Sequence, residues 1–324
     1  MPRLSVVIPS RERVDLLACC LRAVLAHAPA ETEVVVVDDA SPEGCVARCA
    51  ASFPGVRVVS LATPSGFCIA ANTGLRAATA SAVQLLNDDA EPTAGWAEPA
   101  LLALELPGIA AVAPLVLLGS PGSDPVRIDS AGDGYTLGGI AHKIHHGRKL
   151  AEVNLRPGPV FGASGAAAFY RRDVVLSLGG FHEPFGAYFE DVDLAFRLHW
   201  AGWGVWFEPT SRVWHRGGAS HGRPAGTLLE QQSRNEELVF WRNMPARWMW
   251  RALPAHLLVL AGKALRRLNE GTLVPFLRGR WRAWMQVSAV MRHRSVVFSR
   301  DSQRIAVRGL EGLSQNHCAP EPRG

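Results

Sequence analysis

Several signatures that mark common enzyme classes are missing from this 324-residue sequence. No G-x-G-x-x-G follows the first predicted strand and no G-x-x-x-x-G-K is present, which argues against an ordinary dehydrogenase or phosphate-loop NTPase. The single G-x-S-x-G match, at residues 218–222, is not followed by a predicted helix as a nucleophile elbow requires, which argues against an α/β-hydrolase. The six cysteines include no C-x-x-C pair. We therefore expect free thiols in a reducing cytosol rather than a zinc ribbon or a disulfide framework.

The sequence also lacks a long uninterrupted apolar run and a secretory leader. Its longest apolar stretch, residues 100–118, contains Glu105, Pro107, Gly108 and Pro114. A spanning helix needs about 20 apolar residues, so this stretch predicts a soluble helix followed by a buried strand. The amino terminus enters a strand-like run without the charged and apolar regions of a signal peptide. We expect a chain that does not span a membrane, and 48% hydrophobic residues exclude a mostly disordered one.

The first ninety residues alternate apolar strand-like segments with helical patterns, which is typical of a parallel sheet covered on both faces. We expect strands at 4–8, 33–37, 56–61 and 82–86, with helices over 16–25 and through 75–80. Residues 119–159 predict loops and short strands, and 161–169 predict a strand passing close to a ligand or to another backbone. A helix is expected from about Glu190 to a cap at Gly202, followed by two short strands at 205–207 and 213–215.

Polar residues cluster where the predicted strands end, the edge at which such sheets bind ligands. Asp38 and Asp39 follow the second strand, where a carboxylate can accept the imide N–H of a pyrimidine, hold a ribose hydroxyl, or simply cap a helix. Asn87, Asp88 and Asp89 follow the fourth strand. They offer the oxygen ligands that Mg²⁺ or Mn²⁺ prefers, or form a solvated turn.

A third acidic cluster, made of Glu190, Asp191 and Asp193, opens a predicted helix. Acids in a first turn also complement the helix dipole. Positions 191 and 193 point about 200° apart on a helix, so at most one of them serves as a general base toward a substrate. His215, at the end of a strand, is either a metal ligand or a histidine satisfied by its neighbours.

Taken together, these segments resemble the inverting nucleotide-sugar glycosyltransferases of family 2, and most closely their bacterial rhamnosyltransferase-like branch. The resemblance covers about residues 3–240 and rests on LSVVIPSRER, VVVVDDAS, SGFCIAANTGL, VQLLNDDAEP, GASGAAAFYRRDVV, GGFHEPFGAYFEDVDLAFRL and VWFEPTSRVWHRGG in this order. It implies the GT-A fold, an α/β architecture with a Rossmann-like, mostly parallel sheet flanked by helices. We expect a nucleotide-binding half at 1–118, an acceptor-binding half at 119–240, a basic helical segment at 241–300 and a loose tail at 301–324.

The resemblance also implies roles for single residues. Asp191 is the expected catalytic base with Glu190 beside it, and a divalent cation (Mg²⁺ or Mn²⁺) is expected at Asp89, Asn87 and His215. The expected substrate-binding residues are Pro9, Ser10, Arg11, Asp38, Asp39, Gly66, Phe67, Asn72, Asp88, Ser164, Gly165 and Asp193.

The sequence departs from the family pattern at several points. Asn87 stands where the metal motif usually has its first aspartate, and His182 stands where the family usually has aspartate. The Q-x-x-R-W motif of processive synthases is absent, and residues 231–235 (QQSRN) are a poor substitute for it.

These features predict transfer of one sugar per encounter from a UDP- or dTDP-sugar to a glycan or lipid-linked acceptor, in cell-wall or polysaccharide synthesis. The alternatives are a non-catalytic binding protein with this fold, or a sugar-nucleotide nucleotidyltransferase. The latter needs a Gly-rich phosphate loop after the first strand, and residues 9–13 contain no glycine.

Basic charge is concentrated near the carboxyl terminus. Residues 241–300 carry a net +11 and five of the ten tryptophans, whereas the whole chain carries +5. We expect reversible attachment to an anionic membrane surface on the cytoplasmic side, or packing of these Trp and Leu side chains on the catalytic half. No nucleic-acid partner is expected.

Overall fold

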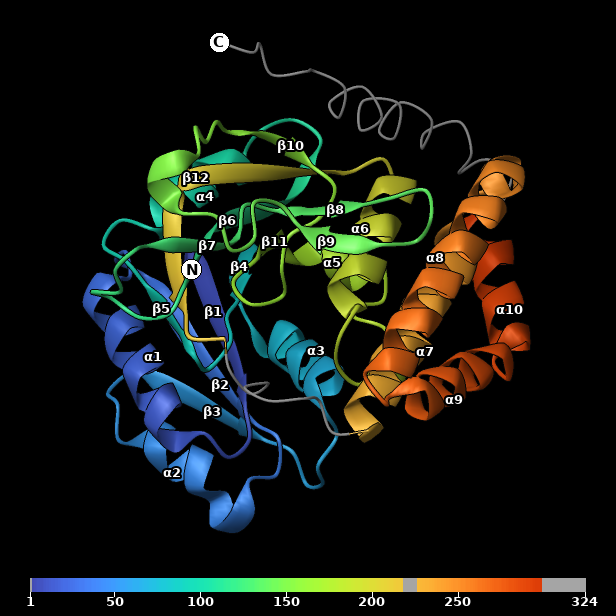
Figure 1. The fold of residues 1–324 in the computed structure, drawn as a ribbon. Helices are drawn as coiled ribbons and strands as arrows, with labels where there is room; N and C mark the ends of the chain where they lie inside the picture. Colours follow the sequence, from blue (N-terminus) through green and yellow to red (C-terminus); the bar gives the residue numbers. More distant parts are fainter. Residues whose placement is uncertain (1, 218–225, 299–324) are drawn as a thin grey trace.

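Within residues 2–217 and 226–298, the part of the chain that this computed structural model describes, ten strands form one curled sheet (Figure 1). These strands are β1 (Leu4–Ser10), β2 (Thr32–Asp38), β3 (Val56–Ser60), β4 (Ala82–Leu85), β5 (Ala90–Pro92), β6 (Ile109–Leu118), β7 (Arg127–Ser130), β10 (Gly158–Val160), β11 (Phe169–Arg171) and β12 (Gly204–His215). They follow the order β10-β12-β6-β11-β4-β1-β2-β3, with β5 on β12 and β7 on β6. A separate hairpin joins β8 (Asp133–Tyr135) to β9 (Ala141–Lys143).

The first part of the sheet is parallel, as the apolar runs predict. β1 pairs in parallel with β2 and β4, and β2 pairs in parallel with β3. Side chains alternate along β1, so Val6 and Ile8 face the core under α1 (Val14–His27) and α2 (Cys45–Ala51). Val7 faces the opposite core under α3 (Phe67–Ala77).

The structure corrects several of the predicted elements. Residues 161–168 form a loop, and only Phe169–Arg171 is a strand, because this segment turns toward α6 (Glu190–Trp200) before it joins the sheet. Residues 204–215 form one long strand with an irregular register rather than two short strands. The helix predicted through residue 80 ends at Ala77. The helix predicted to stop at Gly202 ends at Trp200, and Gly202 follows with a φ of 84°, as expected of a glycine that caps a helix end.

Helices α4 (Ala97–Leu104), α5 (Arg172–Ser177) and α6 (Glu190–Trp200) complete the main body. The described part of the chain ends in α7 (Gly226–Asn243), α8 (Met249–Asn269), α9 (Leu273–Trp284) and α10 (Val287–Val297). These last helices stand together on the side of the molecule away from α1 and α2 (Figure 1). α7 packs against α6, α9 and α10. The basic helical segment is therefore confirmed, and the expected tail at 301–324 lies outside the described residues.

No helix in residues 2–217 and 226–298 combines the length and the apolar character needed to cross a bilayer.

Candidate active site

A cavity of about 600 Å³ opens where β1, β4, β6 and β12 end and α6 begins. Ten of the residues singled out from the sequence line it: Pro9, Phe67, Asn87, Asp88, Asp89, Ser164, Gly165, Glu190, Asp191 and His215. The fold thus brings the acidic cluster at 87–89 into one cavity with Glu190 and Asp191, although about one hundred residues separate them.

One wall holds the acidic cluster that follows β4. Ser10 Oγ donates to Asp88 Oδ2 at 2.7 Å, and Arg13 donates to both Asp88 and, at 2.9 Å, Asp89 Oδ2. Burial raises the pKa of Asp88, and the contacts with Arg13 and Ser10 offset this only in part. Arg13 is therefore a cavity residue that the resemblance did not assign, although the sequence places it in the polar cluster after β1.

His215 lies between two carboxylates. Its Nε2 is 3.2 Å from Asp89 Oδ1, and its Nδ1 donates to Asp129 Oδ2 at 3.0 Å. Burial alone would lower the pKa of His215, but the bonds with Asp129 and Asp89 outweigh it and raise the pKa to about 9. Lys143 Nζ donates to both oxygens of Asp129, at 2.9 and 2.8 Å.

Asp129 and Lys143 escaped the sequence analysis. They lie on β7 and β9, short strands in a Gly-rich stretch whose place in the fold no local pattern indicates. Burial alone would raise the pKa of Asp129, but His215 and Lys143 outweigh it and lower the pKa to about 2.

Asp89 presents a carboxylate oxygen that a divalent cation could bind. Asp89 Oδ1 is buried, makes no hydrogen bond of good geometry with any described residue, and faces His215 Nε2 3.2 Å away. Asn87 Nδ2 lies 3.4 Å from the same nitrogen. One carboxylate, one imidazole and one amide make a small donor set for a metal ion. The described residues contain no group of three His, Cys, Asp or Glu side chains that could hold a metal by themselves. A bound phosphate would have to supply further oxygens.

The opposite wall carries Asp191, on the first turn of α6. Gly165 N–H donates to Asp191 Oδ2 at 2.9 Å, and Val192 N–H donates to Asp191 Oδ1 at 2.8 Å. Two backbone donors therefore fix the carboxylate in place and leave lone pairs for a substrate proton.

Two further buried acids lie close to Asp191. Burial, together with the charge of Asp191, raises the pKa of Glu190 to about 8 and that of Asp133 to about 7. Glu190 Oε2 is buried and makes no hydrogen bond with a described residue. Asp133, at the start of β8, was not predicted. This end of the cavity can hold protons near neutral pH.

The other residues singled out from the sequence do not line the cavity: Ser10, Arg11, Asp38, Asp39, Gly66, Asn72 and Asp193. Asp38 accepts from Ser41 N–H at 2.8 Å and so acts in a turn. Asp39 accepts from the N–H groups of Ser65 and Gly66 at 2.6 and 2.9 Å, which ties it to the start of α3. Asn72 joins α3 to Phe181 by two hydrogen bonds: its Nδ2 donates to Phe181 O at 2.8 Å, and its Oδ1 accepts from Phe181 N–H at 2.7 Å.

Asp193 faces away from the cavity, as the helical geometry predicts. It is fully buried and accepts from Arg197 at 2.8 Å, Arg242 at 3.1 Å and Asn243 at 3.0 Å. Burial alone would raise the pKa of Asp193, but the two guanidinium groups outweigh it and hold the pKa far below its usual range.

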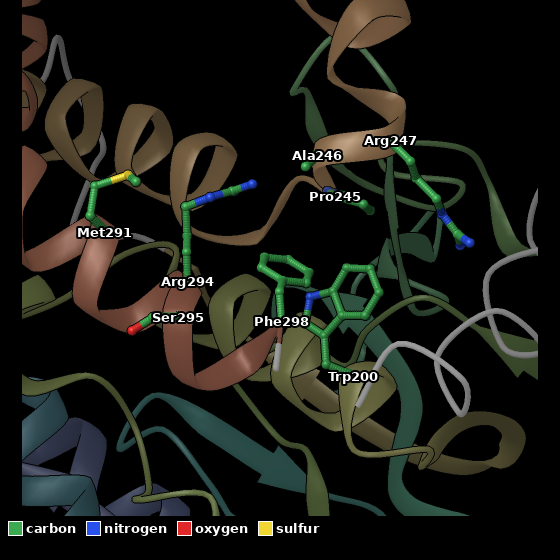
Figure 2. Close-up of a pocket in the computed structure, with 8 residues that line it drawn as sticks. All are labelled: Trp200, Pro245, Ala246, Arg247, Met291, Arg294, Ser295 and Phe298. Atoms are coloured by element: carbon green, nitrogen blue, oxygen red, sulfur yellow. The ribbon is translucent and has the colours of Figure 1, made fainter. Parts of the chain in front are cut away.

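A second cavity, of about 250 Å³, lies between α6 and α10 (Figure 2). Trp200 and Phe298 meet edge to face across it, with ring centroids 4.9 Å apart. No carboxylate is among the described residues that line it. Because it lacks acid or base groups suited to catalysis, the larger cavity is the better candidate for chemistry.

This fold is the GT-A fold of glycosyltransferases. A crystal structure of GalNAc-T7 with UDP, GalNAc and Mn²⁺ aligns with a TM-score of 0.59 over 78% of this chain and 54% of that one, at 15% identity. The mannosyltransferase PcManGT from Pyrobaculum calidifontis, in complex with GDP-Man and Mn²⁺, aligns with a TM-score of 0.54 over 97% and 86%, at 19% identity.

Residues 5–179 match the family described as "Glycosyl transferase family 2", and the chain belongs to this family. Two similar proteins come from Mycobacterium tuberculosis. An N-acetylglucosaminyl-diphospho-decaprenol L-rhamnosyltransferase is 34% identical over 36% of this chain and 40% of its own length. A pre-mycofactocin glycosyltransferase is 28% identical over 89% of this chain and 64% of its own length. A third similar protein, from Sinorhizobium fredii, is matched over 25% of its own length. The chain therefore spans between a quarter and two thirds of the length of these curated relatives.

Proposed function

We propose that this glycosyltransferase moves one sugar from a UDP- or dTDP-sugar to a hydroxyl of a glycan or lipid-linked acceptor, with inversion at the anomeric carbon. The observation that carries the proposal is the pairing of two walls in one cavity. One wall holds Asp89 and His215, and the other holds Asp191 on two backbone N–H groups.

In the proposed reaction, Asp191 accepts the proton of the acceptor hydroxyl. The acceptor oxygen forms a bond to the anomeric carbon while the bond from that carbon to the diphosphate oxygen breaks, and the diphosphate keeps the electron pair. A single in-line displacement of this kind inverts the anomeric carbon. Gly165 contributes by aiming the base, because its N–H bond fixes one oxygen of Asp191.

On the donor side, we propose that Asp89, His215 and Asn87 hold Mg²⁺ or Mn²⁺, which when bound would neutralise the leaving diphosphate. Asp39 is the proposed contact of the pyrimidine base. Its two oxygens already accept N–H bonds from Ser65 and Gly66, which orients the carboxylate and leaves lone pairs for an imide N–H. The names of the relatives and neighbours, with UDP, GDP-Man, Mn²⁺ and a rhamnosyl transfer among them, support a nucleoside-diphosphate-sugar donor, and the UDP of one of them supports a pyrimidine base.

A panel of nucleotide sugars with Mn²⁺ tests the reaction. We expect release of UDP or dTDP from at least one donor. Formation of a nucleotide sugar from a sugar 1-phosphate and a nucleoside triphosphate would instead identify a nucleotidyltransferase. Donor binding without turnover, with acceptors of the glycan and lipid-linked classes supplied, would identify a binding protein.

We also propose that α8 and α9 rest on an anionic membrane at its cytoplasmic face. The decaprenol substrate named for one relative makes a lipid-linked acceptor a reasonable expectation here. α8 buries Ala252 and His256 on one face, while its opposite face exposes Trp250, Leu257, Leu258, Leu265 and Leu268, each more than half accessible. Such a stripe on a solvent-facing helix needs a partner.

α9 repeats the arrangement. It buries Phe276, Gly279 and Ala283 and exposes on the other side Val274, Leu277, Trp281 and Trp284. Residues 241–300 carry a net +11, so anionic headgroups complement this surface in charge, while the Trp and Leu side chains enter the interface.

Flotation with vesicles tests the docking surface. We expect the protein to float at low salt with phosphatidylglycerol vesicles and not with phosphatidylcholine vesicles. The double variant L258Q/W281Q should lose binding, whereas L102Q, which changes an equally exposed leucine on α4, should keep it. Equal binding by both variants would refute the proposed surface.

A further inference from the structure

The segment that leads into Asp191 is held by three side chains of α7. Asn235 is fully buried, and its amide Nδ2 shares its two hydrogens among the carbonyl oxygens of Phe185, Ala187 and Tyr188, each at 2.9 Å. One side chain thereby contacts three of the six residues just before Asp191.

Two residues on the same helix reinforce this contact: Gln231, one turn earlier, and Arg234, the preceding residue. Gln231 Nε2 donates to the carbonyl oxygens of Phe185 and Ala187 at 2.9 and 3.2 Å. Arg234 donates to Pro184 O at 2.8 Å and also to Asn235 Oδ1, at 2.9 and 2.8 Å. The bonds to Oδ1 fix the orientation of the amide, so its N–H groups point at the loop. We call Gln231, Arg234 and Asn235 the α7 clamp.

The clamped segment is in an unfavourable conformation. Tyr188 and Phe189 both have positive φ, 70° and 67°, in the left-handed region that aromatic residues rarely adopt. Such residues persist only where surrounding contacts impose the conformation, and they cluster at functional sites. The very next residues are Glu190 and Asp191, so the direction in which α6 starts is set by these two strained residues.

We propose that the α7 clamp consists of positioning residues for the transfer, which hold residues 184–189 so that Asp191 meets Gly165 at the cavity wall. This rests on the proposed role of Asp191 as base. It also gives a use to the QQSRN stretch, which the resemblance left without one. The clamp does not reach the donor wall, because its contacts are with the loop and not with Asp89 or His215.

A matched control lies on the other side of the same helix. Ser233 is buried and donates through Oγ to Phe276 O at 2.7 Å, which joins α7 to α9. It stands two positions from Asn235, which places the two side chains on opposite faces. The S233A variant loses a buried hydrogen bond of α7 but no contact with residues 184–189.

The test compares N235A, N235D and S233A in the full chain by hydrogen–deuterium exchange and by turnover. For the Asn235 variants we expect at least tenfold faster exchange in peptides covering residues 183–193, and a 10- to 100-fold lower kcat with donor KM within about twofold of wild type. S233A should match wild type within about twofold in both measurements. Q231A, which leaves Asn235 in place, should fall between them and remains informative if the Asn235 variants do not fold.

The proposal is overturned if exchange at 183–193 is unchanged in every clamp variant, or if S233A alters exchange and kcat as much as N235A does. A wild-type protein that turns over no nucleotide sugar would instead refute the proposed function. The exchange measurement still judges the clamp in that case.

Discussion

Asp191 and Asp193 lie two residues apart on α6 and face opposite environments. Asp191 lines the large cavity and accepts only backbone N–H bonds, whereas Asp193 is fully buried between Arg197 and Arg242. One carboxylate is available to a substrate and the other joins α6 to α7. Substitution of the two should therefore have separable effects.

D193N should be strongly destabilising, because it leaves two buried guanidinium groups without an anion. Breaking a buried ion pair costs about 3–5 kcal/mol. The folded-state pKa of Asp193 is depressed, so its contribution is present above an unfolded-state pKa of about 3.9 and is lost as pH falls. Urea unfolding at pH 7 measures it. D191N, measured in parallel, should stay within about 1 kcal/mol of wild type, and equal losses for both variants would contradict this assignment.

E190Q should make stability less dependent on pH. The unfolded state releases the Glu190 proton near pH 4.3, whereas the folded state keeps it until about pH 8. Between these values the folded state binds more protons, so wild-type stability falls as pH rises, by up to about 1.4 kcal/mol per pH unit for one group. In thermal unfolding from pH 5 to 8, the stability of E190Q relative to that of wild type should increase as the pH rises. Parallel curves would mean that Glu190 is ionised throughout.

D89N should abolish stabilisation by Mn²⁺ in the presence of UDP or dTDP. The substitution changes the carboxylate that we propose as a cation ligand, whose Oδ1 has no hydrogen-bond partner of good geometry among the described residues. For wild type we expect a rise in thermal midpoint on adding Mn²⁺ with nucleotide, since a ligand that binds only the folded state stabilises it. D15N, which makes the same change on the exposed side of α1, should respond like wild type. An unchanged response in D89N would place the cation elsewhere.

G74A should destabilise the packing of α3 on β1. A Cβ at Gly74 would overlap the side chain of Val7, where α3 crosses β1, and overpacking of this kind costs about 1–3 kcal/mol. Gly262 on α8 provides the opposite case, because a Cβ there meets nothing within 4 Å. G262A should stabilise by about 0.5–1 kcal/mol through helix propensity. Denaturant midpoints measure both effects. A shift of the two midpoints in the same direction would contradict the prediction.

The parallel part of the fold could be predicted because its signals are local. Buried runs such as Val34–Val37, followed by helical spacing, leave few alternatives, and the acids after the strands share an edge in any such sheet. Segments whose pairing depends on distant strands were harder. The loop at 161–168 is shaped by Asp191, to which Gly165 donates, and a strand-like composition gives no sign of that.

Site residues could be predicted where they form a contiguous sequence motif. They could not be predicted where the fold brings together residues that are far apart in the sequence. The predicted site residues that follow β1, β2 and β4 come in short runs. Asp129 reaches His215 from 86 positions away, and Asn235 reaches Tyr188 from 47 positions away. Only tertiary structure shows these pairs. The apolar side chains of α8 could be read from the sequence. Whether they face the core or the solvent depends on which face of the helix packs on the rest of the protein, and the sequence does not show that.

The central claim is that Asp191 is the base of a nucleotide-sugar transfer, and single-turnover transfer by D191N measures it most directly. The Asn side chain keeps the shape but cannot take the acceptor proton, so we expect a rate at least about 10³-fold below wild type. The affinity for UDP or dTDP with Mn²⁺ should stay within about twofold, because Asp191 lies on the other wall from Asp89 and His215. Turnover by D191N at the wild-type rate would contradict the account.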